Sequence, residues 1–127
     1  MIQQEGPGWR VARDPERAEF GVLVGGEGWA FELTEDEGRV LVGLVGVLEQ
    51  QHGALVDQLM AEETIELELE REVWWGCLAG DRQQWSLSVV LTPSQGRGVE
   101  GHWPHPASAA VVAAMRTLWD ESNDQLN

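Results

Sequence analysis

The clearest pattern of hydrophobic and polar positions lies in residues 64–70. Three aliphatic residues alternate there with three glutamates, in the order Ile65, Glu66, Leu67, Glu68, Leu69, Glu70. A period of two is typical of a strand with one apolar face and one solvated face. The pattern predicts one strand that continues through residues 71–75, a turn at residues 79–82 and a returning strand at residues 85–91. We expect this long hairpin to be the centre of the fold.

Shorter patterns predict the remaining elements. Strands are expected at residues 9–13, 20–24, 29–33 and 99–103, with a glycine turn at residues 25–28. Thr34 and Glu37 have the spacing of a capping box, so a helix should begin there and run to about residue 59. A second helix is expected over residues 107–120.

The order of these elements is three strands and a helix, then three strands and a helix, as in a rough duplication. It predicts the α+β class, with a strongly curved antiparallel sheet and two helices. A chain of 127 residues is long enough for one domain with its own core. We expect a single domain over residues 1–127, ordered from about residue 6 to 121, with a polar lead-in before it and a frayed tail at residues 122–127.

The charge balance restricts the choice of partner. The chain has 22 acidic residues against eight basic ones, all arginines scattered along the sequence, and its net charge is −14. Phosphate backbones and anionic lipid need clustered cations, so nucleic acid and membrane are unfavourable partners. The polar amino terminus has no features of a secretion leader, no apolar run is long enough to span a membrane, and a lone Cys77 cannot form an intramolecular disulfide. These features predict a soluble, cytoplasmic protein.

The glutamate row and the tryptophan pair after it are the candidate partner-binding residues. A basic protein partner would suit the charges of this row. The candidate residues for this contact are Glu66, Glu68, Glu70 and Trp74. A plain solvated face, partly neutralised by arginines on neighbouring strands, is the alternative. Strict alternation places Trp74 on the glutamate side and Trp75 on the apolar side. Either Trp74 is covered by something beyond this face, or a bulge near Gly76 turns it into the core.

The first predicted helix contains several glycines. Gly43 and Gly46 should weaken an isolated helix by up to ~1 kcal/mol each relative to alanine. Close approach of a second backbone would account for them, and the helix is longer than one small sheet requires. We therefore expect a homodimer with Gly43, Gly46 and Leu48 at the contact.

Catalytic and metal chemistry have weak support in the sequence. His102 and His105, with Glu100 nearby, resemble half of a metal site, but no second cluster completes it. Carboxylates in a straight row cannot wrap around an ion, and Cys77 in the middle of a strand is typical of a small buried residue. The sequence contains no nucleophile-elbow, zinc-protease, dinucleotide-binding or kinase pattern. We assign no catalytic residue, no metal ligand and no cofactor.

Several short motifs together resemble a known family. They are Gly8-Trp9-Arg10 before Asp14-Pro15, Gly25-Gly26-Glu27 before Trp29-Ala30 and Glu32-Leu33-Thr34, Asp57-Gln58-Leu59-Met60 before Glu62-Glu63, and Trp74-Trp75, Gly80-Asp81, Glu100-Gly101 and Trp103-Pro104. Over residues 6–120 the chain resembles an uncharacterised cyanobacterial family, the domain of unknown function numbered 1818. The resemblance implies a fold similar to the single-stranded-DNA-binding transcriptional regulators of the coactivator and Whirly type, whose subunits commonly pair. It brings no catalytic residues.

The sequence thus favours a non-enzymatic, acidic protein-binding module. The alternative is a regulator associated with single-stranded nucleic acid, which would need a basic sheet face with aromatic platforms. An enzyme or metal site built on His102, His105 and Glu100 is the third hypothesis.

Overall fold

In the part of the chain that the structure describes, eight strands form two separate four-stranded antiparallel sheets, each followed along the chain by one α-helix. The computed structural model describes residues 1–92 and 96–120. The first sheet consists of β1 (Ile2–Gly6), β2 (Trp9–Arg13), β3 (Val22–Gly26) and β4 (Trp29–Leu33). The second consists of β5 (Ile65–Arg71), β6 (Trp74–Gly80), β7 (Trp85–Leu91) and β8 (Val99–Trp103). In both sheets the strands lie in chain order.

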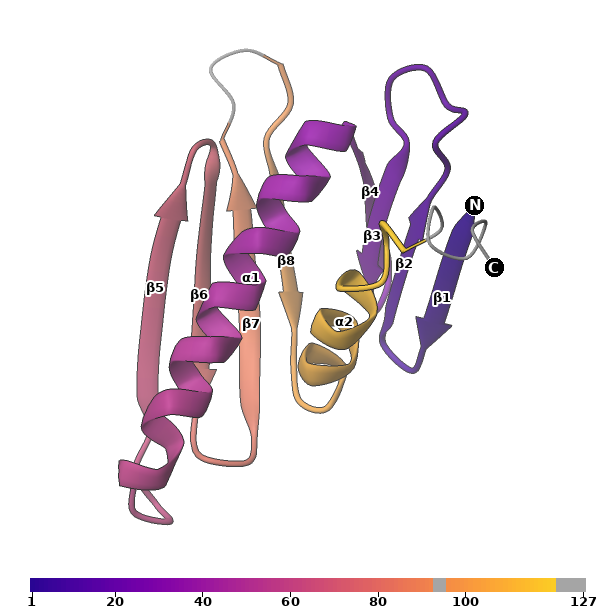
Figure 1. Cartoon of the computed structure of the whole chain (residues 1–127). Helices are drawn as coiled ribbons and strands as arrows, with labels where there is room; N and C mark the ends of the chain where they lie inside the picture. Colours follow the sequence, from indigo (N-terminus) through magenta and orange to yellow (C-terminus); the bar gives the residue numbers. More distant parts are fainter. Residues whose placement is uncertain (93–95, 121–127) are drawn as a thin grey trace.

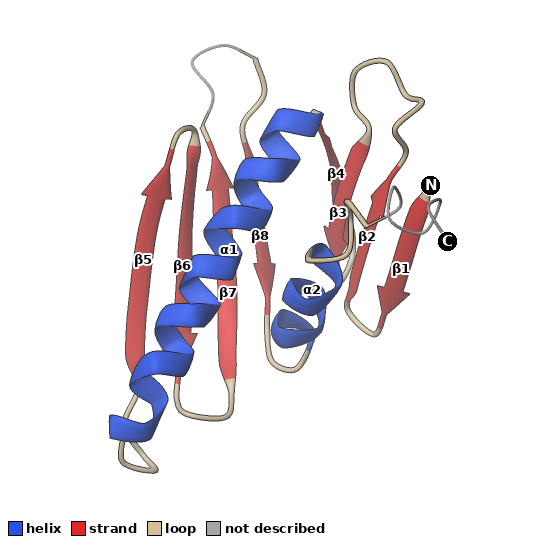
Figure 2. Ribbon diagram, viewed as in Figure 1, coloured by secondary structure: helices blue, strands red, loops and turns tan. Residues whose placement is uncertain are grey.

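Both helices lie on the same side of the sheets (Figures 1 and 2). Helix α1 (Glu35–Leu55), which continues into the short η1 (Val56–Gln58), packs on β5 and β6 of the second sheet. Helix α2 (Ala107–Met115) packs on β2 and β7 and so contacts both sheets. No described helix covers the opposite side, which we call the helix-free face.

The core fills the space between the helices and the sheets. Leu41, Leu44 and Leu48 of α1 are almost completely buried against the second sheet. Gly76 of β6 lies directly below Leu44 and Leu48, where a Cβ would collide with Leu44. Close packing at this depth depends on a residue without a side chain. The apolar faces of the strands and the apolar stripe of α1 therefore pack together as one core.

Side chains join the two sheets where β8 approaches β3 and β4, a region we call the seam. The ring of Trp103 is fully buried, and its Nε1 donates a hydrogen bond to the carbonyl of Gly25 at 2.9 Å. Trp29 packs against Trp103 and Phe31, with ring centroids 5.1 and 5.3 Å apart. A Cβ on Gly101 would lie 2.6 Å from the Trp29 ring, so the ring rests on bare backbone there.

Helix α1 begins as the sequence predicts and ends earlier. Thr34 accepts a hydrogen bond from the amide of Glu37, and the Glu37 carboxylate accepts one from the amide of Thr34, which completes the capping box. The α-helix ends at Leu55 instead of running to residue 59, and the Leu55 side chain is exposed. His52 is the last buried residue of α1, so the apolar stripe stops covering the sheet at that point.

Three other boundaries differ from the prediction. Order was expected to begin only at about residue 6, after a polar lead-in, but Ile2–Gly6 forms β1 and pairs with β2 along its whole length. The strand expected at residues 20–24 is shifted to Val22–Gly26, so Gly25 and Gly26 lie in the strand before the turn. Helix α2 ends at Met115 instead of residue 120. The predicted tail at residues 122–127 lies outside the described residues.

The largest correction concerns the central hairpin. The long strand predicted over residues 64–75 is two strands, β5 and β6, joined by a tight turn at Glu72 and Val73. Glu72 has a φ of 55°, a conformation that residues with side chains seldom adopt. The second half of the chain therefore holds four strands, as does the first, and two sheets replace the one sheet that was predicted.

Candidate functional site

The carboxylates of Glu66, Glu68 and Glu70, the glutamate ladder, lie on the helix-free face as the alternation predicts. All three are exposed, while the leucines between them face the core. They belong to β5, an edge strand of the second sheet. The expected neutralisation by arginines on neighbouring strands is wrong, because none of the ion pairs among the described residues includes a ladder glutamate. Their charges are left for solvent or a partner.

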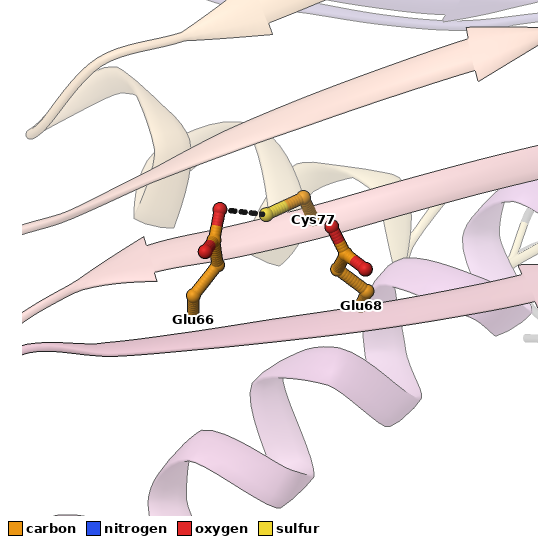
Figure 3. Close-up of side chains that lie close together, drawn as sticks. All are labelled: Glu66, Glu68 and Cys77. Atoms are coloured by element: carbon orange, nitrogen blue, oxygen red, sulfur yellow. Dashed lines mark hydrogen bonds between the residues drawn. The ribbon is translucent and has the colours of Figure 1, made fainter.

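Cys77 lies beside the glutamate ladder, on β6. It is the cross-strand partner of Glu68, and its thiol donates a hydrogen bond to Glu66 Oε1 at 3.7 Å (Figure 3). One potential ligand atom from each of the three residues lies within 4.8 Å of the others. Burial, and then the charges of Glu66 and Glu68 with the Glu66 hydrogen bond, raise the pKa of Cys77 to about 11. The thiol is therefore protonated at neutral pH and is a poor nucleophile.

Trp74 and Trp75 lie on the opposite sides from those that strict alternation predicts. The turn at residues 72–73 pairs Arg71 with Trp74, which reverses the parity of the strand that follows. Trp74 is 1% exposed, and its Nε1 donates to the Glu37 carbonyl at 3.0 Å, so it belongs to the core and its prediction as a partner-binding residue is wrong. Trp75 is half-buried on the helix-free face, with Glu70 and Val90 as its cross-strand neighbours.

Trp75 lines a hollow on the helix-free face of the second sheet, which we call the tryptophan hollow. Its volume is about 490 Å³, and Val90, Glu100, His102 and the edge of Trp29 also line it. His102 Nδ1 is hydrogen-bonded to Ser88 Oγ at 2.8 Å. An aromatic, partly apolar hollow thus lies one strand away from the glutamate ladder. The sequence pattern missed it because its position depends on the unrecognised turn.

The metal or catalytic hypothesis for His102, His105 and Glu100 finds no support in the geometry. Glu100 and His102 point to the same face of β8, whereas His105 lies beyond the end of that strand, next to a cis His105–Pro106 bond. Among the described residues, the only group of three potential ligands that converges is Glu66, Glu68 and Cys77. Helix and strand packing therefore does not bring the three predicted residues together.

The predicted dimer contact divides into two parts. Leu48 is fully buried against the protein's own second sheet, so it cannot contact a second subunit in this structure. Gly43 and Gly46 lie on the other side of α1. A Cβ on Gly46 would meet no atom within 4 Å, and one on Gly43 would meet only the Arg71 side chain. The glycines are therefore available for a contact, and Leu48 is not.

These features define a class: a small α+β protein with an acidic, partly aromatic open sheet face. The chain belongs to the family described as a domain of unknown function (DUF1818), which matches residues 4–118. It is similar to a solved structure of a protein with unknown function, described as from the DUF155 family, from Prochlorococcus sp. NATL2A, a cyanobacterium. The two share 45% sequence identity over 94% of this chain and 100% of that chain, with a TM-score of 0.89. No protein with a curated description matches the sequence.

The comparisons confirm the family that the sequence motifs indicate. The related protein is itself described as having unknown function, so it adds no activity or partner. In the described part of the chain, neither helix has the length and apolar character needed to cross a membrane.

Proposed function

We propose that this protein is a non-enzymatic binding module that docks a basic protein segment on the helix-free face of its second sheet. One observation carries the proposal: the glutamate ladder, which forms no ion pair with any described residue, lies beside the half-buried Trp75 and its hollow. Oppositely charged surfaces guide association and fix orientation. A partly buried aromatic side chain next to them is the kind of residue that supplies much of the binding free energy in protein interfaces.

The proposed partner follows from the chemistry of this face. The acids of the ladder flank Trp75 on one side, and Glu100 lies on its other side along the cross-strand row through Val90. An extended segment with arginine or lysine at alternate positions would place cations at the carboxylates, and an apolar residue at the next position of the same alternating series would lie at Trp75. The ladder has a residue repeat of ~6.6–7 Å along the strand, the same repeat as that of an extended partner.

Binding without catalysis is supported by the state of the reactive groups. The Cys77 thiol is protonated at neutral pH because its pKa is raised, and it donates its hydrogen bond to the Glu66 carboxylate and not to a histidine, the usual activating partner of a cysteine nucleophile. His102 is paired with Ser88 on an exposed strand surface, with no third group that orients it among the described residues.

Single-stranded nucleic acid is the alternative occupant of this face. The family resemblance implies a fold similar to regulators that bind it, and Trp75 could stack on a base. The carboxylates that surround the ring oppose this, because phosphates gain affinity from cations. We therefore place nucleic acid second.

We also propose that the protein is a cytoplasmic homodimer that pairs through the outer side of α1. Gly43 and Gly46 support this contact because both lack side chains on a surface that the protein's own sheets do not cover. The contact would leave the helix-free face open to a partner.

A titration with defined probes tests the binding proposal. The probes are a peptide with arginine at three alternate positions and leucine at the next position of the same series, its glutamate-for-arginine counterpart, and oligothymidine. We expect the basic peptide alone to bind. The triple variant E66Q/E68Q/E70Q should weaken it roughly tenfold or more, since each exposed ion pair contributes ~0.5–1 kcal/mol and every 1.4 kcal/mol is tenfold.

Two controls make the result specific. The variant E16Q/E19Q/E27Q removes the same charge from the first half of the chain and should leave the affinity nearly unchanged. The substitution Trp75→Ala should weaken binding by ~2 kcal/mol if the ring is an anchor. Equal loss in the two triple variants, or binding of oligothymidine in preference to the peptide, would refute the proposal.

A further inference from the structure

A second hollow lies on the first-sheet side of the seam, and its chemistry differs from that of the tryptophan hollow. Its volume is about 470 Å³, within the usual range for small-molecule sites. Leu23, Ala30 and Phe31 line it from the first sheet, Val99 from β8 and Phe20 from the loop before β3. Arg10 of β2 reaches its rim, and we call it the arginine hollow.

Small residues create this hollow. Glu5, Arg10, Gly25 and Ala30 lie opposite one another in a row across β1 to β4. A Cβ on Gly25 would be 3.2 Å from Cγ of Arg10 and 3.1 Å from Cβ of Ala30. The stem of Arg10 therefore lies across Gly25, on the side of the hollow. A larger residue at position 25 would push this stem aside.

Arg10 is the cation at this site that forms no ion pair within the described residues. Arg97, which also lines the hollow, is held by the Glu37 carboxylate and the Glu32 carbonyl, and its guanidinium lies 4.6 Å from the centre of the Phe20 ring. The carboxylate of Glu32 is paired with Arg17 at 3.1 Å. Arg10 forms no ion pair with any described residue, including Glu5 opposite it. One guanidinium, with five donors, remains available.

We propose that the arginine hollow binds a small amphipathic monocarboxylate, with its apolar body on Leu23, Ala30 and Phe31 and its carboxylate on Arg10. A guanidinium binds a carboxylate with two parallel hydrogen bonds, and the aliphatic and aromatic lining removes the apolar body from water. Arg97, which lines the hollow, is paired with Glu37, and the lining residue Glu32 is paired with Arg17. A single free cation matches a single negative charge better than a phosphate group or a polyanion.

The net charge of the protein makes selective binding of an anion a stringent test of a local site. At −14, the overall field attracts cations and repels anions. A preference for the anionic member of a matched ligand series can therefore come only from a local arrangement. Octanoate, octanol and octylammonium form such a series, because they share an alkyl chain and differ in the charge of the head group.

The test follows each ligand by ¹H–¹⁵N correlation spectra of the full chain. We expect octanoate to shift the amides of Leu23, Gly25 and Ala30 with saturation in the millimolar range, as the few contact atoms of such a ligand allow. Octanol should bind at least tenfold more weakly at these amides, and octylammonium should not shift them. Equal binding of octanol, shifts of these amides by octylammonium, or octanoate shifts that do not saturate or map elsewhere would overturn the proposal.

Three variants locate the site. Arg10→Gln should weaken octanoate about tenfold, the equivalent of one hydrogen-bonded charge. Ala30→Leu should fill the hollow and abolish the saturable shifts, without touching the buried core because Ala30 is exposed. Arg82→Gln, on the turn after β6, removes the same charge at a distance and should have no effect. If Arg82→Gln weakens octanoate as much as Arg10→Gln does, or if Ala30→Leu leaves binding intact, the site is not the arginine hollow.

Discussion

Glu37 is the residue at which the start of α1, the end of β4 and the segment before β8 are joined. Its carboxylate accepts hydrogen bonds from the Thr34 amide at 2.9 Å and from Arg97 Nη2 at 2.5 Å. The same Nη2 donates to the Glu32 carbonyl at 2.9 Å. The substitution Glu37→Gln keeps an oxygen that can accept from Thr34 and removes the charge that Arg97 binds. It therefore separates the ion pair from the capping box.

The structure sets the expected size of the effect. A hydrogen bond to a charged group contributes ~1.5–3 kcal/mol, but the Arg97 side chain is 36% exposed, so solvent screening reduces the value. We expect Glu37→Gln to lower the free energy of unfolding by about 1–2 kcal/mol, and the midpoint of thermal unfolding by roughly 3–8 °C for a chain of this size. Asp36→Asn, one residue earlier in the same turn, should cost only ~0.3–1 kcal/mol through the helix dipole.

The effect should depend on pH. Burial, the largest single influence, raises the pKa of Glu37, but the hydrogen bonds from Arg97 and Thr34 and the Arg97 charge together outweigh it and hold the pKa below its usual value. A lowered pKa in the folded state means that the stabilisation is fully present above the ordinary glutamate pKa of ~4.3 and is lost as the pH falls through the lower folded value. The wild type and Glu37→Gln should therefore differ at pH 7 and converge at acidic pH, below the lowered folded pKa of Glu37.

Urea unfolding followed by tryptophan fluorescence would measure these differences. A double-mutant cycle of Glu37→Gln with Arg97→Gln should give a coupling free energy of about 1 kcal/mol at pH 7, and the coupling should fall towards zero as the pH drops through the lowered folded pKa of Glu37. Two results would refute this reasoning. One is a coupling near zero at pH 7, and the other is an Asp36→Asn variant as unstable as Glu37→Gln.

Three further predictions concern the second sheet and the helix above it. Gly76→Ala should destabilise the protein by ~1–3 kcal/mol, because the added methyl group would overpack the core. Gly46→Ala, in open space on a helix, should stabilise a monomer by ~1 kcal/mol but weaken a dimer that packs at this position. Thermal unfolding would measure the stability of each variant, and light scattering would show whether a dimer is lost. Trp74→Ala should cost ~3–5 kcal/mol in urea unfolding and Trp75→Ala clearly less, because only the first ring is fully buried. The Cys77 thiol, with its raised pKa, should react with iodoacetamide at pH 8 roughly a hundredfold more slowly than a free thiol. Replacing the neighbouring glutamates by glutamine should make this reaction faster than in the wild type. Mass spectrometry of the alkylated protein would measure both rates.

The local parts of the fold could be predicted because local chemistry determines them. The spacing of Thr34 and Glu37 is sufficient for a capping box, and the alternation in residues 65–70 is sufficient to place three glutamates on one face. Neither inference depends on the rest of the chain. The family could also be identified, since its motifs extend over almost the full length of the sequence.

The turn at Glu72 and Val73 could not be predicted because neither residue carries a turn signal. A hairpin turn of two residues usually contains glycine, asparagine or aspartate, and Glu72 takes a positive φ without them. Because the two turn residues reverse the side-chain parity, one missed turn exchanged the positions of Trp74 and Trp75. The candidate site was misassigned by the same error, since Trp75 lines the hollow and Trp74 does not.

The first strand and the arginine hollow were missed for a different reason. The residues of β1 are mostly polar, and they form a strand because β2 offers a complete ladder of partners. The hollow combines residues from β2, β3, β4 and β8 and from the segments that precede β3 and β8. Only the cross-strand register brings such residues together, and no short sequence window contains it.

The position of the glutamate ladder at the edge of a sheet restricts how the sheet could grow. If a second copy added its β5 in antiparallel orientation, every register that kept the leucines on the helix side would set glutamate opposite glutamate, as when Glu68 faces its own copy and Glu66 faces Glu70. Shifting by one residue would turn the leucines outward. Charge repulsion therefore disfavours pairing of β5 with a second copy of itself. A strand added at this edge would need positive charge at alternate positions.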